Sequence, residues 1–261
     1  EGIYIEWQDD CFTRVDVCSR PSTGLDAGEI FPDHLLLPGL LNAHCHLDYS
    51  FLQGLLPRDT GFAGWLRKMI RLRKMKPTAD KIIEHHQKSR LDAARSGTSG
   101  LWDIVSDILP DDSPLAAKIG TYGIRFHEWI CPDRDRIASN WGRFRESRFG
   151  NEYPGGSLEK DVISAWGSHG EALSVHSVYS VCEDAMLCAS SWAQKNSVPV
   201  AIHLAESPEE IEMMMTGSGE LLDLLKKVSP EKEFGFAECG RSPVQRAEAA
   251  GLLNSSTLAI H

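Results

Sequence analysis

The 261-residue sequence lacks several features on which common classes of protein depend. Basic residues are scarce, since 27 Lys and Arg face 37 Asp and Glu for a net charge of -10, which argues against general binding to nucleic acid or anionic membranes. No apolar stretch is long enough to cross a bilayer, and no signal peptide opens the sequence. No glycine-rich phosphate-binding motif follows an apolar run. We therefore expect a globular protein whose partners are small molecules, with a homo-oligomer left open.

Cysteines are present, but not in an arrangement that suggests a disulfide framework. There are seven of them, an odd number, and none forms a C-x-x-C pair. That pattern favours a reducing compartment, and we expect the protein in the cytoplasm.

The pattern of apolar and polar residues changes near residue 37. Residues 1–37 read as short strands, at 3–5 and 14–17, and turns, including one at 21–24, with no helical period, which indicates a small β unit. From residue 38 to residue 261, apolar runs alternate with amphipathic helical stretches, as in repeated β-α units around a parallel sheet. The expected strands lie within residues 35–46, 98–105, 122–130, 172–181, 198–205 and 257–261.

Six β-α units allow two architectures. They are about three quarters of a (β/α)8 TIM-type barrel, which usually needs about 250 residues. They would also complete a six-stranded doubly wound sheet, although the phosphate-binding motif typical of that fold is missing. Because no helix follows the run at 257–261, we expect the polypeptide to extend beyond His261.

Seven stretches have helical character: residues 65–76, 79–95, 136–149, 183–195, 208–215, 220–228 and 243–253. The first carries six basic residues, which by itself would fit a surface that binds nucleic acid or membrane. Because the chain is acidic and no stacking aromatics are interleaved, we expect a solvated helix face, with Trp65, Met69 and Leu72 buried.

Histidines stand at or near the ends of four apolar runs. His44 and His46 close the first run, and since strand side chains alternate, both imidazoles face one side while Cys45 faces the other. His203 ends another run, and His261 ends the last. Imidazole nitrogens at the carboxyl ends of strands are the ligands of catalytic Zn²⁺ or Fe²⁺ sites. An H-x-H pair alone is also compatible with an ordinary polar strand end.

Two other groups have competing interpretations. Glu206 could carry protons beside a metal, or it could simply be a glutamate favoured by the dipole of the helix that follows Pro208. His176 could contact substrate, or it could be a hydrogen-bonded core histidine.

Several segments together resemble the strand motifs of the amidohydrolase superfamily. The resemblance is to its mononuclear aminohydrolases, which include adenosine-type and guanine-type deaminases and chlorotriazine hydrolases. It rests on PGLLNAHCH (38–46), GTSG (97–100) leading into Trp102 and Asp103, HSVYS (176–180), HLAES (203–207), and GLL (251–253) with TLAIH (257–261).

The resemblance implies a (β/α)8 barrel flanked by a small β-sandwich, of which residues 1–37 would be part. It implies one divalent metal, Zn²⁺ first and Fe²⁺ as the alternative, bound by His44, His46 and His203. Glu206 would then shuttle protons, His261 would orient water or substrate, and His176 would contact substrate. The family's remaining ligand, an aspartate after the eighth strand, has no counterpart in the six runs.

The resulting hypothesis is a hydrolytic deaminase acting on an amino-substituted heterocycle, such as a purine-like nucleoside, with aminodeoxyfutalosine as one candidate substrate. Two alternatives stay open. The same chemistry could expel chloride in a hydrolytic dechlorinase, or the chain could be a truncated barrel fragment without catalytic activity.

Overall fold

The computed structural model describes residues 2–8, 11–18, 31, 33–57, 59–75, 77–106, 121–150, 170–228 and 240–261. The chain divides into two compact units, Glu1–Pro38 and Gly39–His261.

The first unit contains a pair of antiparallel strands. Strand β1 (Gly2–Gln8) pairs with β2 (Cys11–Cys18), and the register shifts between Glu6 and Trp7. The strands expected near residues 3–5 and 14–17 are thereby confirmed, whereas the turn expected at 21–24 lies outside the described residues. That this unit is part of a β-sandwich stays a prediction.

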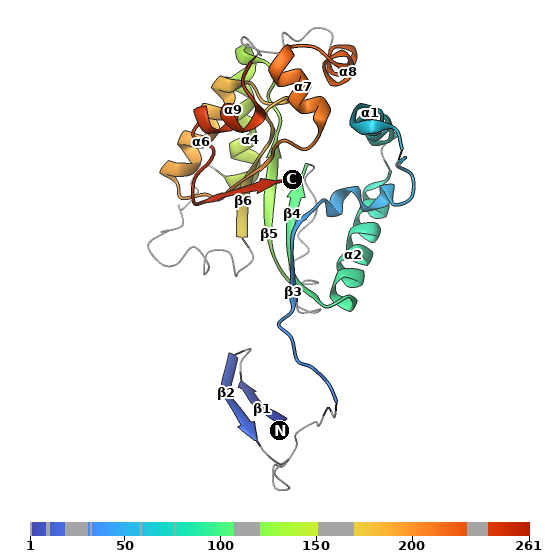
Figure 1. The fold of residues 1–261 in the computed structure, drawn as a ribbon, viewed down its shortest axis with the longest axis vertical. Coiled ribbons are helices and arrows are strands. Elements are labelled where there is room, and N and C mark those ends of the chain that lie inside the picture. The colour runs from blue at the N-terminus through green and yellow to red at the C-terminus, as the bar shows by residue number, and fades with distance from the viewer. Residues whose placement is uncertain are drawn as a thin grey trace. The chain divides into compact units, whose positions relative to one another are not determined.

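The second unit is built on a sheet of six parallel strands (Figure 1). The strands are β3 (Leu40–Cys45), β4 (Thr98–Val105), β5 (Tyr122–Trp129), β6 (Gly170–Ser177), β7 (Val200–His203) and β8 (Thr257–Ile260). They lie side by side in chain order, β3 to β8. A doubly wound sheet reverses its strand order partway across, so this order excludes that alternative. The six strands form a half-barrel, and the predicted α/β barrel class is confirmed.

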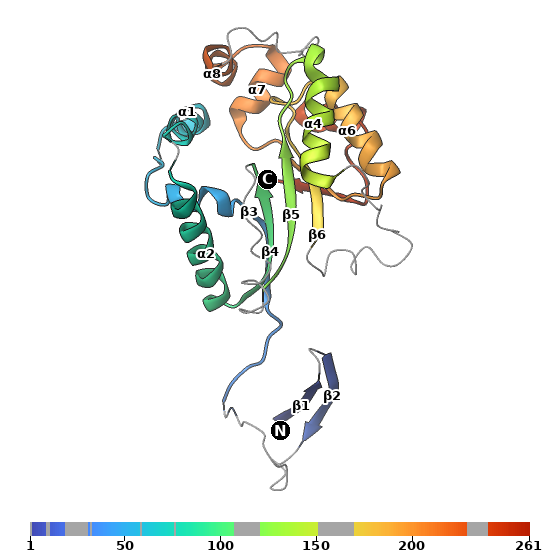
Figure 2. The ribbon, with the colours of Figure 1, turned by 180° about the vertical axis from the view of Figure 1, so that it is seen from behind.

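Helices follow the strands and flank the half-barrel (Figures 1 and 2). They are η1 (Leu47–Leu52), α1 (Gly61–Arg73), α2 (Ala79–Arg95), η2 (Arg134–Arg136), α4 (Ile137–Phe149), α6 (Glu183–Lys195), α7 (Pro208–Thr216), α8 (Glu220–Val228) and α9 (Pro243–Ala249). Among the described α-helices, α2, α7 and α9 begin after an N-cap residue whose side-chain oxygen accepts a backbone N–H; these residues are Thr78, Ser207 and Ser242. Among the described residues, no helix combines the length and apolar character that crossing a membrane requires.

Several elements are shorter than the sequence predicted, and three of them have a clear local reason. Strand β3 begins at Leu40, after Pro38, which has no N–H to donate to a sheet. Strand β6 ends at Ser177, where a turn closed by the N–H of Ser180 begins. Helix α9 ends at Ala249, just before Gly251 takes a left-handed φ of 68°.

The basic helix α1 is amphipathic as predicted. Of the three residues expected to be buried, Met69 is buried, whereas Trp65 and Leu72 are only half-buried; Arg67 and Lys68 are exposed to solvent. Arg73, at the end of the helix, instead lies over the ring of Tyr49, with its guanidinium carbon 5.0 Å from the ring centre.

Apolar side chains pack on both faces of the sheet, as alternation along parallel strands requires. One cluster contains Ile104, Ile124, Phe126, Ala172, Ala201 and Ile260. A larger cluster joins the other face to the helices and includes Trp129, Leu173, Val175 and Met186. Burying one such side chain contributes about 1.5–3 kcal/mol. This packing holds the strand ends in a fixed register.

Candidate active site

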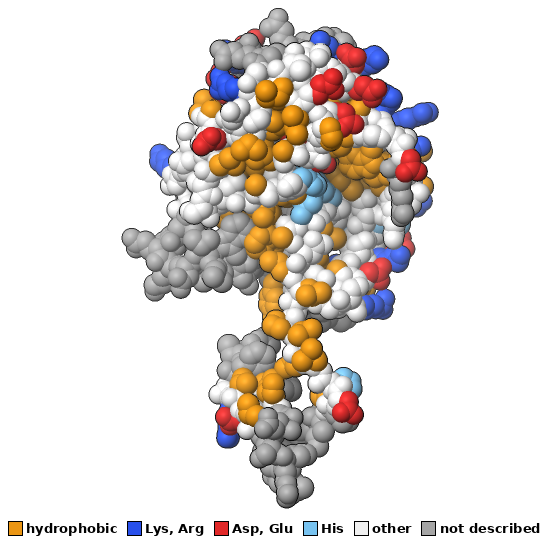
Figure 3. Space-filling view, viewed as in Figure 1, with side chains coloured by type: hydrophobic (Ala, Val, Ile, Leu, Met, Phe, Trp, Pro, Cys, Tyr) orange, Lys and Arg blue, Asp and Glu red, His pale blue; other side chains and the backbone are white. Residues whose placement is uncertain are grey.

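The histidines predicted from the sequence come together at the carboxyl ends of the strands. His44 lies in β3 and His46 follows it, His203 ends β7, His176 lies in β6, and His261 follows β8. Histidine side chains reach the surface in the middle of the face shown in Figure 3. The carboxyl ends of parallel strands are where barrel enzymes keep their active sites.

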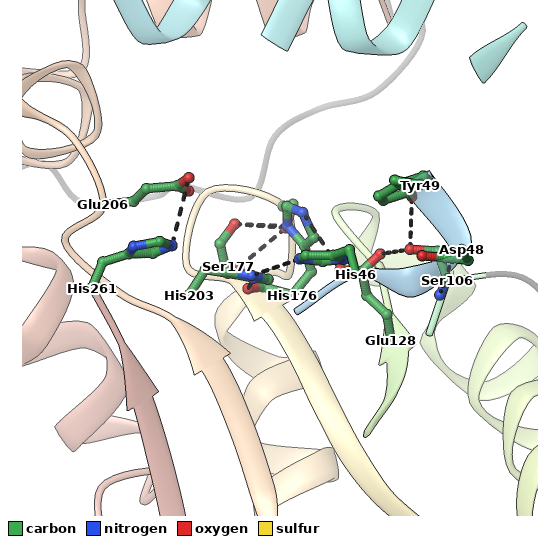
Figure 4. A network of polar contacts seen from close by, with 11 residues as sticks. His46, Asp48, Tyr49, Ser106, Glu128, His176, Ser177, His203, Glu206 and His261 are labelled. Carbon is green, nitrogen blue, oxygen red and sulfur yellow. Dashed lines mark hydrogen bonds and ion pairs between the residues drawn. The ribbon is translucent and has the colours of Figure 1, made fainter. Parts of the chain in front are cut away.

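His44, His46 and His203 form the tightest part of this cluster. Each offers one ring nitrogen, and the three nitrogens lie within 4.8 Å of one another. The Nε2 atoms of His46 and His203 are 3.3 Å apart (Figure 4). The ring of His44 lies 5.0 Å from each of the other two rings, measured between centroids.

The geometry fits a tetrahedral metal. Two Zn–N bonds of about 2.0–2.1 Å at a tetrahedral angle place their nitrogens roughly 3.3 Å apart, as Nε2 of His46 and His203 are. The Nδ1–H of His203 donates to the backbone carbonyl of His176 at 2.9 Å, because a carbonyl can only accept. Nε2 of His203 therefore carries the lone pair, turned toward His46.

Burial keeps the imidazoles neutral. It is the largest cause that lowers the pKa of His44 to about 4, with His261 adding to the effect. Burial likewise lowers the pKa of His46 to about 3, which the nearby Glu128 partly opposes, and the pKa of His203 to about 3. Neutral imidazoles at pH 7 have the lone pairs that a metal ligand needs.

Glu206 lies on the loop that follows β7, and its side chain is next to that of His261. Its Oε1 atom is 3.7 Å from Nε2 of His261 (Figure 4). Burial, and next the charge of Glu210, raise the pKa of Glu206 to about 7. A carboxyl group with this pKa both takes up and releases a proton near neutral pH. The preceding residue, Ala205, has a left-handed φ of 57°.

His176 is held by hydroxyl groups from the turn after β6. Its Nδ1 lies 2.6 Å from Oγ of Ser180 and 3.1 Å from Oγ of Ser177. Its Nε2 lies 3.8 Å from Oε1 of Glu128. The ring centroid of His176 is 5.3 Å from that of His203, so the residue borders the three-histidine cluster without belonging to it.

Glu128 was not among the site residues predicted from the sequence. It is a buried carboxylate near the end of β5. Its Oε2 accepts a hydrogen bond from Ser106 at 2.5 Å, and Oγ of Ser106 accepts one from Tyr49 at 2.7 Å (Figure 4). The available signal was its position, at the end of an apolar run like the histidines.

Glu128, His176 and His203 form a second set of ligand atoms within 4.8 Å. Because Nε2 of His203 has a single lone pair, it can serve only one of the two sets at a time. His203 can therefore bind one ion at a time, and the single metal predicted from the sequence stays a prediction.

Carboxylates also support the turn that follows His46. Oδ1 of Asp103, in β4, accepts the backbone N–H of Leu47 at 2.8 Å. Oδ2 of Asp48, in the same turn, accepts the N–H of Ser106 at 3.0 Å. His86, from α2, places Nε2 3.7 Å from Oδ2 of Asp103. These contacts connect the H-x-H segment to β4 and α2.

Comparison with known proteins adds relatives of similar sequence. The chain is 24% identical over 229 residues to a 5-methylthioadenosine/S-adenosylhomocysteine deaminase of Pyrococcus furiosus. The alignment covers 87% of this chain and 47% of that protein. The chain thus spans about half the length of the curated relatives it matches.

Solved structures share the fold at lower identity. The aminofutalosine deaminase of Helicobacter pylori, in complex with methylthio-coformycin, superimposes with a TM-score of 0.55 at 20% identity, over 78% of this chain and 46% of that one. A zinc-bound variant of atrazine chlorohydrolase from Arthrobacter aurescens gives a TM-score of 0.56 at 14% identity, over 85% of this chain and 48% of that one.

The family comparison covers strands β3 to β7 and most of the candidate site. Residues 35–240 match the model of the amidohydrolase family. The matched region contains His44, His46, His176, His203 and Glu206. The chain belongs to the amidohydrolase family.

Proposed function

We propose that the protein is a metal-dependent hydrolase that removes an amino group from a heterocycle, in the class of purine-like nucleosides. The observation that carries the proposal is the convergence of three neutral imidazoles beside a carboxyl group with a pKa of about 7. The names of its deaminase relatives point to the same class of substrate.

His44, His46 and His203 would hold one divalent ion, with Zn²⁺ favoured and Fe²⁺ as the alternative. Zinc is supported by the 3.3 Å separation of the two Nε2 atoms and by the zinc in the related hydrolase structures. Such an ion lowers the pKa of water toward neutrality and so supplies a nucleophile at pH 7.

The remaining groups would move protons and orient the substrate. Glu206 would accept a proton from the attacking water at Oε1 and give it to the ring nitrogen. It would then carry a second proton, from the hydroxyl group added to the ring carbon, to the departing amine, so that ammonia leaves and a carbonyl group remains. His261, 3.7 Å from that oxygen, would hold the attacking oxygen and share the developing charge. His176, whose Nδ1 is held by Ser180, would present Nε2 to the substrate.

A specific observation favours loss of ammonia over loss of chloride. An amine leaves only after it has gained a proton, whereas chloride leaves without one. A carboxyl group whose pKa is raised to about 7 is suited to deliver that proton at neutral pH. We therefore place the deaminase ahead of the dechlorinase.

The test is turnover per bound metal. The purified protein would be analysed for Zn²⁺ and Fe²⁺ and assayed for ammonia release from adenosine, 5′-methylthioadenosine, S-adenosylhomocysteine and aminodeoxyfutalosine. Chloride release from a chlorotriazine would test the alternative. Glu206→Gln keeps the shape of the side chain and leaves the three imidazoles unchanged, so metal should stay bound while kcat falls by about 10²–10⁴-fold.

Glu212→Gln is the matched control, because Glu212 is an exposed carboxylate on α7. Its turnover should equal that of wild type. If Glu206→Gln were as active as Glu212→Gln at equal metal content, Glu206 would be no more than a glutamate at a helix terminus, and the proposed mechanism would be wrong.

A further inference from the structure

Glu210, the third residue of α7, makes unusual hydrogen bonds. Its carboxylate does not bind the backbone N–H that a glutamate at this helix position usually binds. Ser207 is the N-cap of the helix, and its Oγ accepts the N–H of Glu210, three residues later, at 3.2 Å. In a capping box, the side chain at this third position bonds back to the N–H of the cap residue itself. The Glu210 carboxylate reaches further back along the chain.

Its two oxygens bind two consecutive backbone amides ahead of the cap. Oε2 accepts the N–H of Glu206 at 2.8 Å, and Oε1 accepts the N–H of Ala205 at 3.3 Å. Helix α9 of the same chain provides the ordinary arrangement for comparison. There Gln245 bonds to the N–H of its own cap, Ser242, at 2.9 Å.

The turn that Glu210 holds is strained, and it carries Glu206. Ala205 has a φ of 57°, a left-handed conformation that is unfavourable for a residue with a side chain. Such a conformation persists only where its surroundings over-determine it. Glu210 is fully buried, so its two hydrogen bonds face no competition from water.

We propose that Glu210 is a positioning residue for the reaction: by binding the amides of Ala205 and Glu206 it holds the strained turn that aims the Glu206 carboxyl group at the reacting atoms. The inference rests on the proposed role of Glu206 and adds a residue that acts on the chemistry through the backbone.

Charge gives Glu210 a second effect on the same group. The charge of Glu210 helps to raise the pKa of Glu206. Among the described residues, the other titratable groups near the pair are His261, 3.7 Å from Glu206, and the buried Tyr179. Burial raises the pKa of Tyr179 most, and the charges of Glu206 and Glu210 raise it further. Neutralising Glu210 should therefore move the proton affinity of Glu206 as well as its position.

The test compares Glu210→Gln with Glu209→Gln. Glutamine has one acceptor oxygen, so it can bind one of the two amides while its NH₂ group opposes the other. Glu209 is the matched control because it is the adjacent residue on α7, and it also accepts a backbone N–H, that of Phe62 in α1, at 2.9 Å. Both variants lose a carboxylate and weaken backbone contacts, but only one of them touches the turn that holds Glu206.

Three results are expected for Glu210→Gln. The amides of Ala205 and Glu206 should exchange hydrogen faster, which NMR measures without any substrate. With metal content and KM unchanged, kcat should fall by about 10–100-fold, as for a small misplacement of a reacting group. The acid limb of the kcat profile should move to lower pH, because a negative charge next to Glu206 has been removed. Glu209→Gln should show none of the three.

Unchanged exchange at these two amides would overturn the proposal, as would a kcat and an acid limb that match those of Glu209→Gln. The exchange measurement decides the role of Glu210 even if wild type turns over none of the compounds, an outcome that would count against the proposed function alone.

Discussion

Removal of the Asp103 carboxylate should weaken both the fold and the metal site. Oδ1 of Asp103 accepts the N–H of Leu47, the residue that directly follows His46. Asp103 is 2% exposed and Leu47 is 6% exposed, so in Asp103→Ala this N–H has no ready access to water. A hydrogen bond to a charged group is worth about 1.5–3 kcal/mol, and an unsatisfied buried donor costs a similar amount.

We therefore expect Asp103→Ala to lower the free energy of unfolding by about 2–3 kcal/mol. Asp103→Asn keeps an acceptor oxygen and should cost about 1 kcal/mol. Because the turn that holds His46 is loosened, affinity for Zn²⁺ should fall by roughly 10-fold in Asp103→Ala, as it does for other residues that orient metal ligands.

Urea unfolding and competition with a zinc chelator would measure the two effects. Asp92→Ala is the control, because Asp92 is an exposed aspartate on α2 whose contacts with Lys88 and Arg95 are surface ion pairs. Its stability should change by less than about 0.5 kcal/mol. If Asp103→Ala bound Zn²⁺ as tightly as Asp92→Ala, the turn after His46 would not depend on Asp103, and the reasoning would be refuted.

Two further predictions concern pH and packing. As pH falls from 6.5 to 4, the free energy of unfolding of the metal-free protein should decrease. The unfolded chain takes up protons at four imidazoles that burial keeps neutral in the folded protein, those of His44, His46, His176 and His203. Glu206 and Glu210, whose pKa values are raised to about 7, oppose this trend, but they are two groups against four imidazoles. Urea unfolding at stepped pH measures the effect, and a free energy of unfolding that increased as pH fell from 6.5 to 4 would contradict the prediction. Gly123→Ala should cost about 3 kcal/mol, since a Cβ there would lie 2.6 Å from the backbone oxygen of Leu101. Gly142→Ala, on α4 with nothing within 4 Å of its Cβ, should instead be neutral or stabilise the protein by up to about 1 kcal/mol, and equal thermal stabilities for the two variants would refute the argument.

Features with a short-range cause could be predicted well. Helices α2, α6 and α8 begin and end at the predicted residues, because periodic apolar positions extend along each of them. The histidines at strand ends were also predictable. The carboxyl ends of parallel strands share one edge of the sheet, so residues far apart in sequence meet there.

Features that depend on long-range register could not be predicted. The chain from Tyr49 through Ser106 to Glu128 joins segments that follow or end three different strands, and no local pattern indicates that they touch. The hydrogen bonds from the amides of Ala205 and Glu206 to Glu210 could not be predicted either. The spacing of Ser207 and Glu210 fits a capping box, and only the left-handed turn at Ala205 brings the two earlier amides within range of the carboxylate.

The pleat of β3 also determines which kinds of metal ion the site can attract. Cys45 lies between His44 and His46, yet its Sγ turns to the other side and donates to the carbonyl of Trp102 at 3.4 Å. Burial, and next the charge of Asp103, raise the pKa of this thiol, so it stays protonated. The most polarisable donor in the segment is thereby kept out of the coordination sphere. The nitrogen donors that face the cluster suit borderline ions such as Zn²⁺ and Fe²⁺, and offer little to thiophilic ions such as Cu⁺.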